Sequence, residues 1–328
     1  MDQKRNQRNK NTCFVSFKKK ITCVFLYFCF LLLFTIKSYS EDNLNLKYKA
    51  AIVVDANNGE VLYSYNPDMA IYPASLTKIM TAYIVFSAVE QGVIGINDHI
   101  STNNNTTIKN LLYQMAINSH NDATNILARE IYGSTGSFIN SMNNTARKMN
   151  MKNTHFANTN GLFNENHYST VRDIAKVSIR LVYDFPQYAD IFGITNYIDE
   201  DDEYNIKTTT IQQNIKGIEG SKTGYIDASG YNLALWGHYY GKHIFVVISG
   251  VNEKVNRDRV AVLLLNKVLK RYKNDFYSGI DINDLLKKRN NDNYFNKLCN
   301  FLDINCSQYI SPTPKIRRQT INYFNYNK

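Results

Sequence analysis

Three short polar segments carry the residues of this sequence that are best suited to covalent chemistry. They are Ser75-Leu76-Thr77-Lys78, Ser119-His120-Asn121 and Lys222-Thr223-Gly224. Residues three apart on a helix share a face, so a helix beginning near Ser75 would bring its hydroxyl close to the Lys78 amine. Serine is a poor nucleophile unless a base removes its proton, and a neutral lysine can be that base. Partial burial, a helix N-terminus and a second lysine, for which Lys222 is the candidate, would each lower the pKa of Lys78.

The second segment lies between two predicted helices, where short polar side chains reach into a cleft from a rigid support. Ser119 can pass a proton between Lys78 and a leaving amine, and the Asn121 amide can hold the backbone of a peptide substrate. The ordinary structural alternative is a capping loop before a helix, just as Ser75 alone could be an N-cap.

The third segment falls on a predicted strand. The Lys222 cation and the Thr223 hydroxyl can bind a carboxylate, and Gly224 lacks a Cβ, so the strand can approach a substrate closely. A strand with an exposed lysine and a bulge is the alternative. Each motif is weak singly, but three in this order, each on the element that its role needs, favour acyl transfer through a serine.

The surrounding pattern predicts a mixed α/β (α+β) domain whose first and last strands share one antiparallel sheet flanked by helices. Strands are expected at 47–55 and 60–65, joined by Asn57-Asn58-Gly59, and a helix runs from Pro73-Ala74-Ser75 to about 89. A polar loop is expected at 101–107. Further helices are expected at 108–117, 122–132, 134–150 and from near Thr170, followed by strands at 219–226, 231–240 and 243–251 and a helix at 257–272.

The net charge of +10 is concentrated at the N-terminus, since residues 1–40 hold eight Lys and Arg against one Asp. A nucleic-acid binder keeps its basic excess on the folded domain, so no nucleic-acid partner is expected. Residues 1–40 instead have the pattern of a signal peptide, with an apolar stretch at 21–36 and small residues at Ser38 and Ser40. An uncleaved membrane anchor is the alternative, and either interpretation predicts an exported protein of the periplasm or cell envelope.

The sequence divides into the signal peptide, a domain at 41–272 and a short appendage at 273–328 that is predicted to be partly disordered. Cys299 and Cys306 lie close together in this appendage, and an exported compartment would permit a disulfide between them. Its end, from Arg317 to Tyr326, could make weak contact with a membrane surface, although a solvated tail is favoured. The six histidines form no HExxH motif, so neither a metal nor a cofactor is expected.

From about Ala50 to Tyr272, the sequence resembles the D-alanyl-D-alanine carboxypeptidases of peptidase family S11, the low-molecular-mass penicillin-binding proteins. Beyond the three motifs, the resemblance rests on Asp55–Leu62, Tyr72–Thr81, Ser119–Ala123, Asn160-Gly161-Leu162, His167–Thr170 and Gly230–Leu233. It implies a β-lactamase/transpeptidase-like fold and a serine peptidase acting on peptidoglycan stem peptides, with β-lactams as covalent inhibitors.

The resemblance also implies roles for individual residues. Ser75 would be the nucleophile and Lys78 its base, with Ser119 assisting proton transfer. Lys222 and Thr223 would bind the terminal carboxylate. An oxyanion hole would come from the backbone N–H groups of Ser75 and Tyr225. Arg257 falls where the family places an arginine near that carboxylate, and Arg259 competes for the role.

The sequence departs from the family in two ways. A shortened stretch between Lys78 and Ser119 leaves the substrate preference open, and residues 273–328 are too short for the β-rich second domain of many relatives. A D,D-endopeptidase acting on cross-linked peptides uses the same motifs. A β-lactamase needs a residue that activates water, and Glu165 lacks the expected surroundings. A catalytically silent peptidoglycan-binding envelope protein is the alternative outside enzymes, and three intact motifs argue against it.

Overall fold

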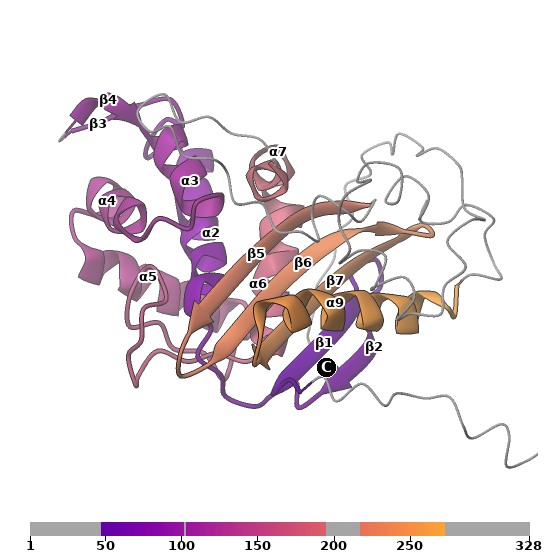
Figure 1. Cartoon of the computed structure of the whole chain (residues 1–328). Helices are drawn as coiled ribbons and strands as arrows, with labels where there is room; N and C mark the ends of the chain where they lie inside the picture. Colours follow the sequence, from indigo (N-terminus) through magenta and orange to yellow (C-terminus); the bar gives the residue numbers. More distant parts are fainter. Residues whose placement is uncertain (1–46, 102, 195–216, 273–328) are drawn as a thin grey trace, which may run out of the picture. The chain divides into compact units, whose positions relative to one another are not determined.

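The computed structural model describes residues 47–101, 103–194 and 217–272. A five-stranded antiparallel sheet, in the order β2-β1-β7-β6-β5, forms the centre of this part (Figure 1). Its strands are β1 (Ala50–Asp55), β2 (Glu60–Tyr65), β5 (Ile218–Ile226), β6 (Gly230–Tyr239) and β7 (Lys242–Val251). The prediction of an antiparallel sheet shared by the first and last strands is confirmed, because β1 pairs with β7 along its whole length.

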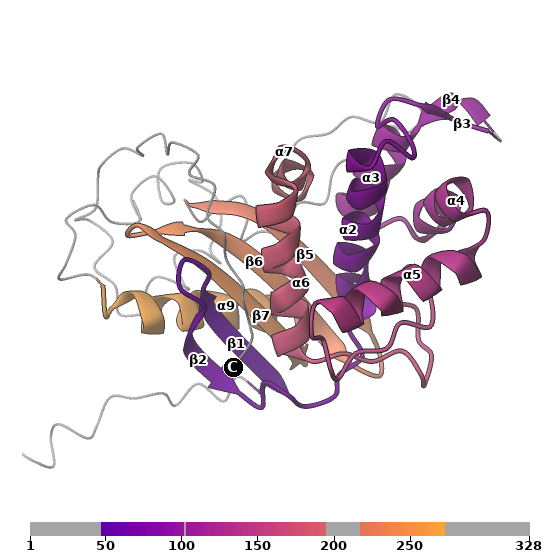
Figure 2. The same cartoon turned by 180° about the vertical axis from the view of Figure 1, so that it is seen from behind.

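Helices cover both faces of the sheet. α6 (Val171–Asp184) packs on one face and α9 (Lys254–Leu269) on the other, which Figures 1 and 2 show from opposite sides. Each face has its own apolar core, and β1 contributes alternate residues to the two, so Ile52 faces the α6 side and Val53 the α9 side. The uninterrupted burial of β1 follows from this double covering.

A second group of helices lies beside β5. It comprises α2 (Thr77–Glu90), α3 (Ile108–Ala116), α4 (Asn121–Tyr132) and α5 (Thr135–Lys148), and a 3-10 turn, η1 (Ala74–Leu76), leads into α2. α2 is buried along most of its length, because α3, α4, α5 and α6 all pack around it. A short α7 (Pro186–Ala189) and a 3-10 turn, η2 (Asp190–Gly193), follow α6.

Most predicted elements lie within a few residues of the observed ones, but the polar loop predicted at 101–107 is wrong. β3 (His99–Ile100) and β4 (Asn103–Thr107) form a small antiparallel ladder there, which the low strand propensity of asparagine concealed. α9 begins three residues before its predicted start. The predicted signal peptide, the appendage and the Cys299–Cys306 pair lie outside the described residues. Within the described residues, no helix has both the length and the apolar character needed to span a membrane.

Candidate active site

Ser75 and Lys78 meet at the start of α2, one helical turn apart. Lys78 Nζ lies 3.0 Å from Ser75 Oγ, 2.8 Å from Asn121 Oδ1 and 2.8 Å from the carbonyl oxygen of Asn160. A neutral amine has two N–H donors and one lone pair. The two carbonyl oxygens accept both donors, so the lone pair is left to accept the Ser75 hydroxyl proton. The geometry therefore suits a neutral Lys78 acting as a base.

The surroundings of Lys78 favour this neutral form. Its side chain is completely buried at the centre of the helical group. Burial, together with the positive charge of Lys222, lowers the pKa of Lys78 from 10.5 to about 6. At neutral pH most of the Lys78 amines are therefore unprotonated, as general-base catalysis requires.

Lys222 approaches the same site from the sheet. It lies on β5, almost fully buried, and its Nζ donates to Ser119 Oγ at 3.0 Å and to the Thr223 carbonyl at 3.2 Å. Burial and the nearby charge of Arg257 lower its pKa to about 7. Ser119 has a left-handed backbone, with φ of 59°, in the turn between α3 and α4. This conformation is rare for a residue with a Cβ, and here it belongs to the residue that meets Lys222.

β5 packs directly against the turn that carries Ser75. A Cβ placed on Gly224 would lie 2.9 Å from Ser75 N and 3.1 Å from the Pro73 carbonyl oxygen, so only glycine allows this approach. The adjoining strand β6 holds the same turn, because buried Asn232 donates to the Tyr72 carbonyl at 3.1 Å. The sheet and the helical group are therefore joined at Ser75.

The loop after α5 supplies the second acceptor of Lys78 through the backbone of Asn160. Hydroxyl groups bind this loop to two helices. Thr81 of α2 donates to the Thr159 carbonyl at 2.6 Å, and the Thr124 and Thr159 hydroxyls are 2.8 Å apart. Thr124 of α4 also donates to the Asn121 carbonyl at 2.6 Å. Both oxygen acceptors around the Lys78 amine are thus held by one buried network.

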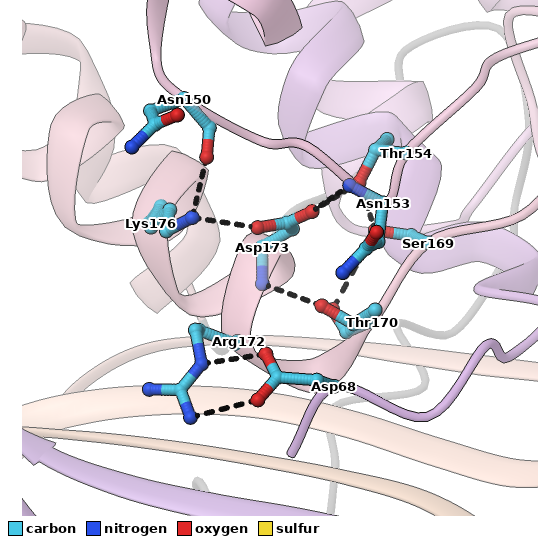
Figure 3. A network of polar contacts seen from close by, with 9 residues as sticks. All are labelled: Asp68, Asn150, Asn153, Thr154, Ser169, Thr170, Arg172, Asp173 and Lys176. Carbon is cyan, nitrogen blue, oxygen red and sulfur yellow. Dashed lines mark hydrogen bonds and ion pairs between the residues drawn. The ribbon is translucent and has the colours of Figure 1, made fainter.

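A polar network at the start of α6 anchors the beginning of the same loop, just after α5 (Figure 3). Asp173 accepts hydrogen bonds from two groups of the loop and from Lys176. Arg172 binds both carboxylate oxygens of Asp68, at 2.7 and 3.0 Å, which attaches the segment before the nucleophile to α6 (Figure 3). The backbones of Ile71 and Ser169 pair beside it.

His167 contacts the start of α2 through the side chain of Thr77. Its Nδ1 accepts the Ala157 N–H at 3.1 Å, so the neutral ring carries its proton on Nε2 and donates to Thr77 Oγ1 at 2.8 Å. Burial, with a contribution from His155, lowers the pKa of His167 to about 4. A buried neutral imidazole therefore orients Thr77, which precedes Lys78 directly.

The remaining predicted residues lie around this centre at different depths. Arg257 is buried near the start of α9 and forms an ion pair with Asp258, with Nε 2.7 Å from Oδ1. Thr223 is partly buried on β5. Tyr225 is half-exposed, and its hydroxyl donates to Asp227 at 2.6 Å. The alternative arginine, Arg259, is partly exposed beside Asn256.

Comparison with known proteins agrees with this arrangement. The sequence profile of the D-alanyl-D-alanine carboxypeptidase family, peptidase family S11, matches residues 37–106 and 97–252. These matches contain all three motifs. The chain belongs to this family.

Individual S11 relatives give the extent of the similarity. D-alanyl-D-alanine carboxypeptidase DacA of Haemophilus influenzae is 30% identical over 201 residues, which cover 56% of this chain and 51% of the relative. DacF of Bacillus subtilis is 28% identical over 247 residues, covering 68% and 62%. Penicillin-binding protein D2 of Listeria monocytogenes, solved in its cefotaxime-bound form, superposes with a TM-score of 0.63 at 26% identity, covering 70% of this chain and all of that one. The matches span less than two thirds of both curated relatives.

The predicted β-lactamase/transpeptidase-like fold is confirmed by this superposition. The three motifs do not include three further contributors to the site of this S11 chain: the Asn160 carbonyl, the His167 ring and the Asn232 amide. All three groups belong to stretches that resemble the family, but no role could be predicted for them from the sequence. A backbone carbonyl has no residue signature, and the contacts of the other two residues cross between elements.

Proposed function

We propose that this protein is a serine-type D-alanyl-D-alanine carboxypeptidase that removes the terminal D-Ala from peptidoglycan stem peptides. The observation that carries the proposal is the position of the Lys78 amine, whose Nζ lies 3.0 Å from Ser75 Oγ and 2.8 Å from each of two oxygen acceptors. Membership of the S11 family supports the same activity. An exported protein of the cell envelope is the localisation that this substrate requires.

In the first half of the reaction, Ser75 Oγ attacks the carbonyl carbon of the penultimate D-Ala while its proton passes to Lys78 Nζ. Backbone N–H groups of Ser75 and Tyr225 stabilise the oxyanion. Lys222, Thr223 and Arg257 bind the terminal carboxylate of the substrate.

The tetrahedral intermediate collapses with cleavage of the C–N bond. The proton that Lys78 took from Ser75 passes through Ser119, which lies beside Lys222, to the departing amine of the terminal D-Ala, so Lys78 is neutral again. Asn121 aligns the peptide and holds Lys78 in place. In the second half, Lys78 takes a proton from water, the hydroxide attacks the acyl carbon, and the proton returns to Ser75 Oγ as the ester bond breaks.

Labelling of the purified protein with a fluorescent penicillin tests the nucleophile. Stable labelling is expected in the wild type and in Ser87→Ala, which alters a serine elsewhere on α2, and is expected to be lost in Ser75→Ala. Mass spectrometry of the labelled peptide identifies the acylated residue. No labelling of the wild type would favour a silent binding protein, and rapid turnover of the drug would favour a β-lactamase.

Defined substrates test the reaction itself. Incubation with a stem pentapeptide should yield tetrapeptide and free D-Ala, and Ser75→Ala should yield neither. A cross-linked dimer serves as the comparison substrate. Faster cleavage of the dimer than of the pentapeptide would assign the enzyme to the endopeptidases instead.

A further inference from the structure

A second cluster of reactive side chains lies on the sheet, apart from the three motifs. Glu219 of β5, His238 of β6 and His243 of β7 place one donor atom each within 4.8 Å of one another. His238 Nδ1 is 2.7 Å from Glu219 Oε1, and His243 Nε2 is 3.2 Å from Glu219 Oε2. The two imidazole rings stack, with centroids 4.0 Å apart. Two imidazoles and a carboxylate therefore converge on one point.

A β-bulge directs Glu219 toward the histidines. His238 pairs with His243 and lies two residues from Trp236, so all three side chains share one face of the sheet. Gly220 points to that face as well, because a Cβ on it would touch the Trp236 ring. In a regular strand Glu219 would then point to the opposite face. The pairing of β5 and β6 slips at this residue, and the slip brings its carboxylate to the imidazoles.

The buried member of the cluster has an unsatisfied nitrogen. His243 is 4% exposed, and its Nδ1 bonds to the Tyr183 hydroxyl of α6 at 3.0 Å. Its Nε2 points into the cluster but has no hydrogen-bond partner among the described residues, since its contact with Glu219 lacks hydrogen-bond geometry. A buried polar nitrogen without a partner is costly, and bound cations are one way in which proteins satisfy such atoms.

We propose that Glu219, His238 and His243 form a binding site for a divalent transition-metal ion of the Zn²⁺ class. Two imidazoles and one carboxylate are a known ligand set for Zn²⁺, which leaves one coordination position open. Metal–ligand bonds of about 2.1 Å place tetrahedral ligand atoms about 3.4 Å apart. The His243 contact of 3.2 Å with Glu219 is close to this spacing, whereas the His238 contact of 2.7 Å has hydrogen-bond length and would have to lengthen when a metal binds. The Tyr183 hydroxyl on Nδ1 of His243 supplies the outer partner that orients a metal-binding imidazole.

The position of the site indicates what the metal would do. Glu219 precedes Lys222 by three residues on the same strand, about 10 Å at the rise of a β-strand. A metal bound to β5, β6 and β7 would fix the bulge and the start of the strand that carries Lys222. The site is therefore a structural clamp beside the active site, and it takes no part in the acyl transfer.

Metal binding to the full chain, freed of metal by a chelator, tests this site. Titration calorimetry with Zn²⁺ is expected to give one site per chain, and Co²⁺ is expected to give visible d–d absorption. Glu219→Gln and His238→Gln, both at partly exposed positions, should weaken Zn²⁺ binding at least tenfold. His99→Gln, at an exposed position outside the cluster, should bind like the wild type. Cooperative thermal unfolding of each variant establishes that it is folded.

Two results would overturn the proposal. One is a wild type without saturable Zn²⁺ binding, and the other is unchanged affinity in both cluster variants. X-ray absorption of the Zn²⁺-loaded wild type provides a measurement that needs no variant. It should show two imidazole ligands, and a thiolate or all-oxygen environment would contradict the site. None of these measurements depends on the peptidase activity.

Discussion

The chemistry of the Lys78 amine depends on two oxygen acceptors that occupy its N–H groups and on a cation that opposes its protonation. All three are supplied by residues far away in the sequence, namely Asn121, the Asn160 carbonyl and Lys222. Ser75 and Lys78, the proposed nucleophile and base, are close in sequence and only one helical turn separates them. Their protonation states are set by the tertiary structure.

This arrangement predicts a bell-shaped pH dependence of acylation. Lys78 must be neutral, so the rate should rise as pH increases through its pKa of about 6. Lys222 must be charged to bind a carboxylate, so the rate should fall as pH passes its pKa of about 7. The second-order rate constant for acylation by penicillin, measured from pH 5 to 9, tests both limbs. A rate that is still rising at pH 9 would mean that Lys78 has the pKa of an ordinary lysine.

The close approach of β5 to Ser75 predicts that Gly224→Ala impairs acylation. The new methyl group would lie 2.9 Å from Ser75 N, which forces apart the two elements that carry the proposed oxyanion hole. We expect the acylation rate to fall by at least about tenfold, since complete loss of one oxyanion donor costs about 10²- to 10³-fold. Gly136→Ala in α5, where a Cβ meets only the Ser134 hydroxyl at 4.0 Å, is the matched control and should acylate normally.

At the residue scale, the sequence predicted side chains better than backbone groups. Ser75, Lys78, Ser119, Asn121 and Lys222 were all named from motif spacing, and the structure brings them together. The Asn160 carbonyl could not be predicted, because any residue can supply a carbonyl oxygen. The convergence of Glu219 with its two histidines was also hidden, because it depends on a strand register and a bulge.

At the scale of elements, strongly periodic segments were predicted well, and short polar ones were not. β2 has the predicted bounds, and α3, α4 and α6 begin within about a residue of the expected positions, since apolar periodicity and polar caps mark them. β3 and β4 have neither signal. The packing of α2 among four helices also has no local signature, because it results from contacts between distant segments.

The buried His167 that joins the loop to α2 predicts a loss of stability in acid. Its pKa is about 4 in the folded protein and 6.5 ordinarily, so the unfolded state binds more protons between these values. The free energy of unfolding is therefore unaffected by His167 above pH 6.5 and should fall by about 3 kcal/mol as pH drops to 4. His167→Gln can accept from Ala157 and donate to Thr77 without titrating. Urea unfolding should show a shallower pH dependence in this variant than in the wild type and His99→Gln.

At the scale of the molecule, the site lies where the helical group meets the sheet, and cations from both sides gather there. Lys78 comes from α2, Lys222 from β5 and Arg257 from α9, on the opposite face of the sheet from α6. The antiparallel fold was predictable from the order of elements. The effect of Arg257 on α9 upon the pKa of Lys222 on β5 was not. The charge of Arg257 reaches Lys222 because both groups are buried, where water screens them little.

Because Arg257 on α9 lowers the pKa of Lys222 on β5, a substitution of Arg257 should alter the pH dependence of acylation. Arg257→Gln removes the charge that lowers the pKa of Lys222, so the pKa of Lys222 should rise. The alkaline limb of acylation should then move to higher pH, while the acid limb set by Lys78 should stay near 6. KM for a peptide with a free terminal carboxylate should increase, because one cation is lost. Arg259→Gln, a substitution of the partly exposed arginine that directly follows the Arg257–Asp258 pair, is the control and should leave both limbs in place. An alkaline limb that does not move in Arg257→Gln would show that α9 does not tune Lys222.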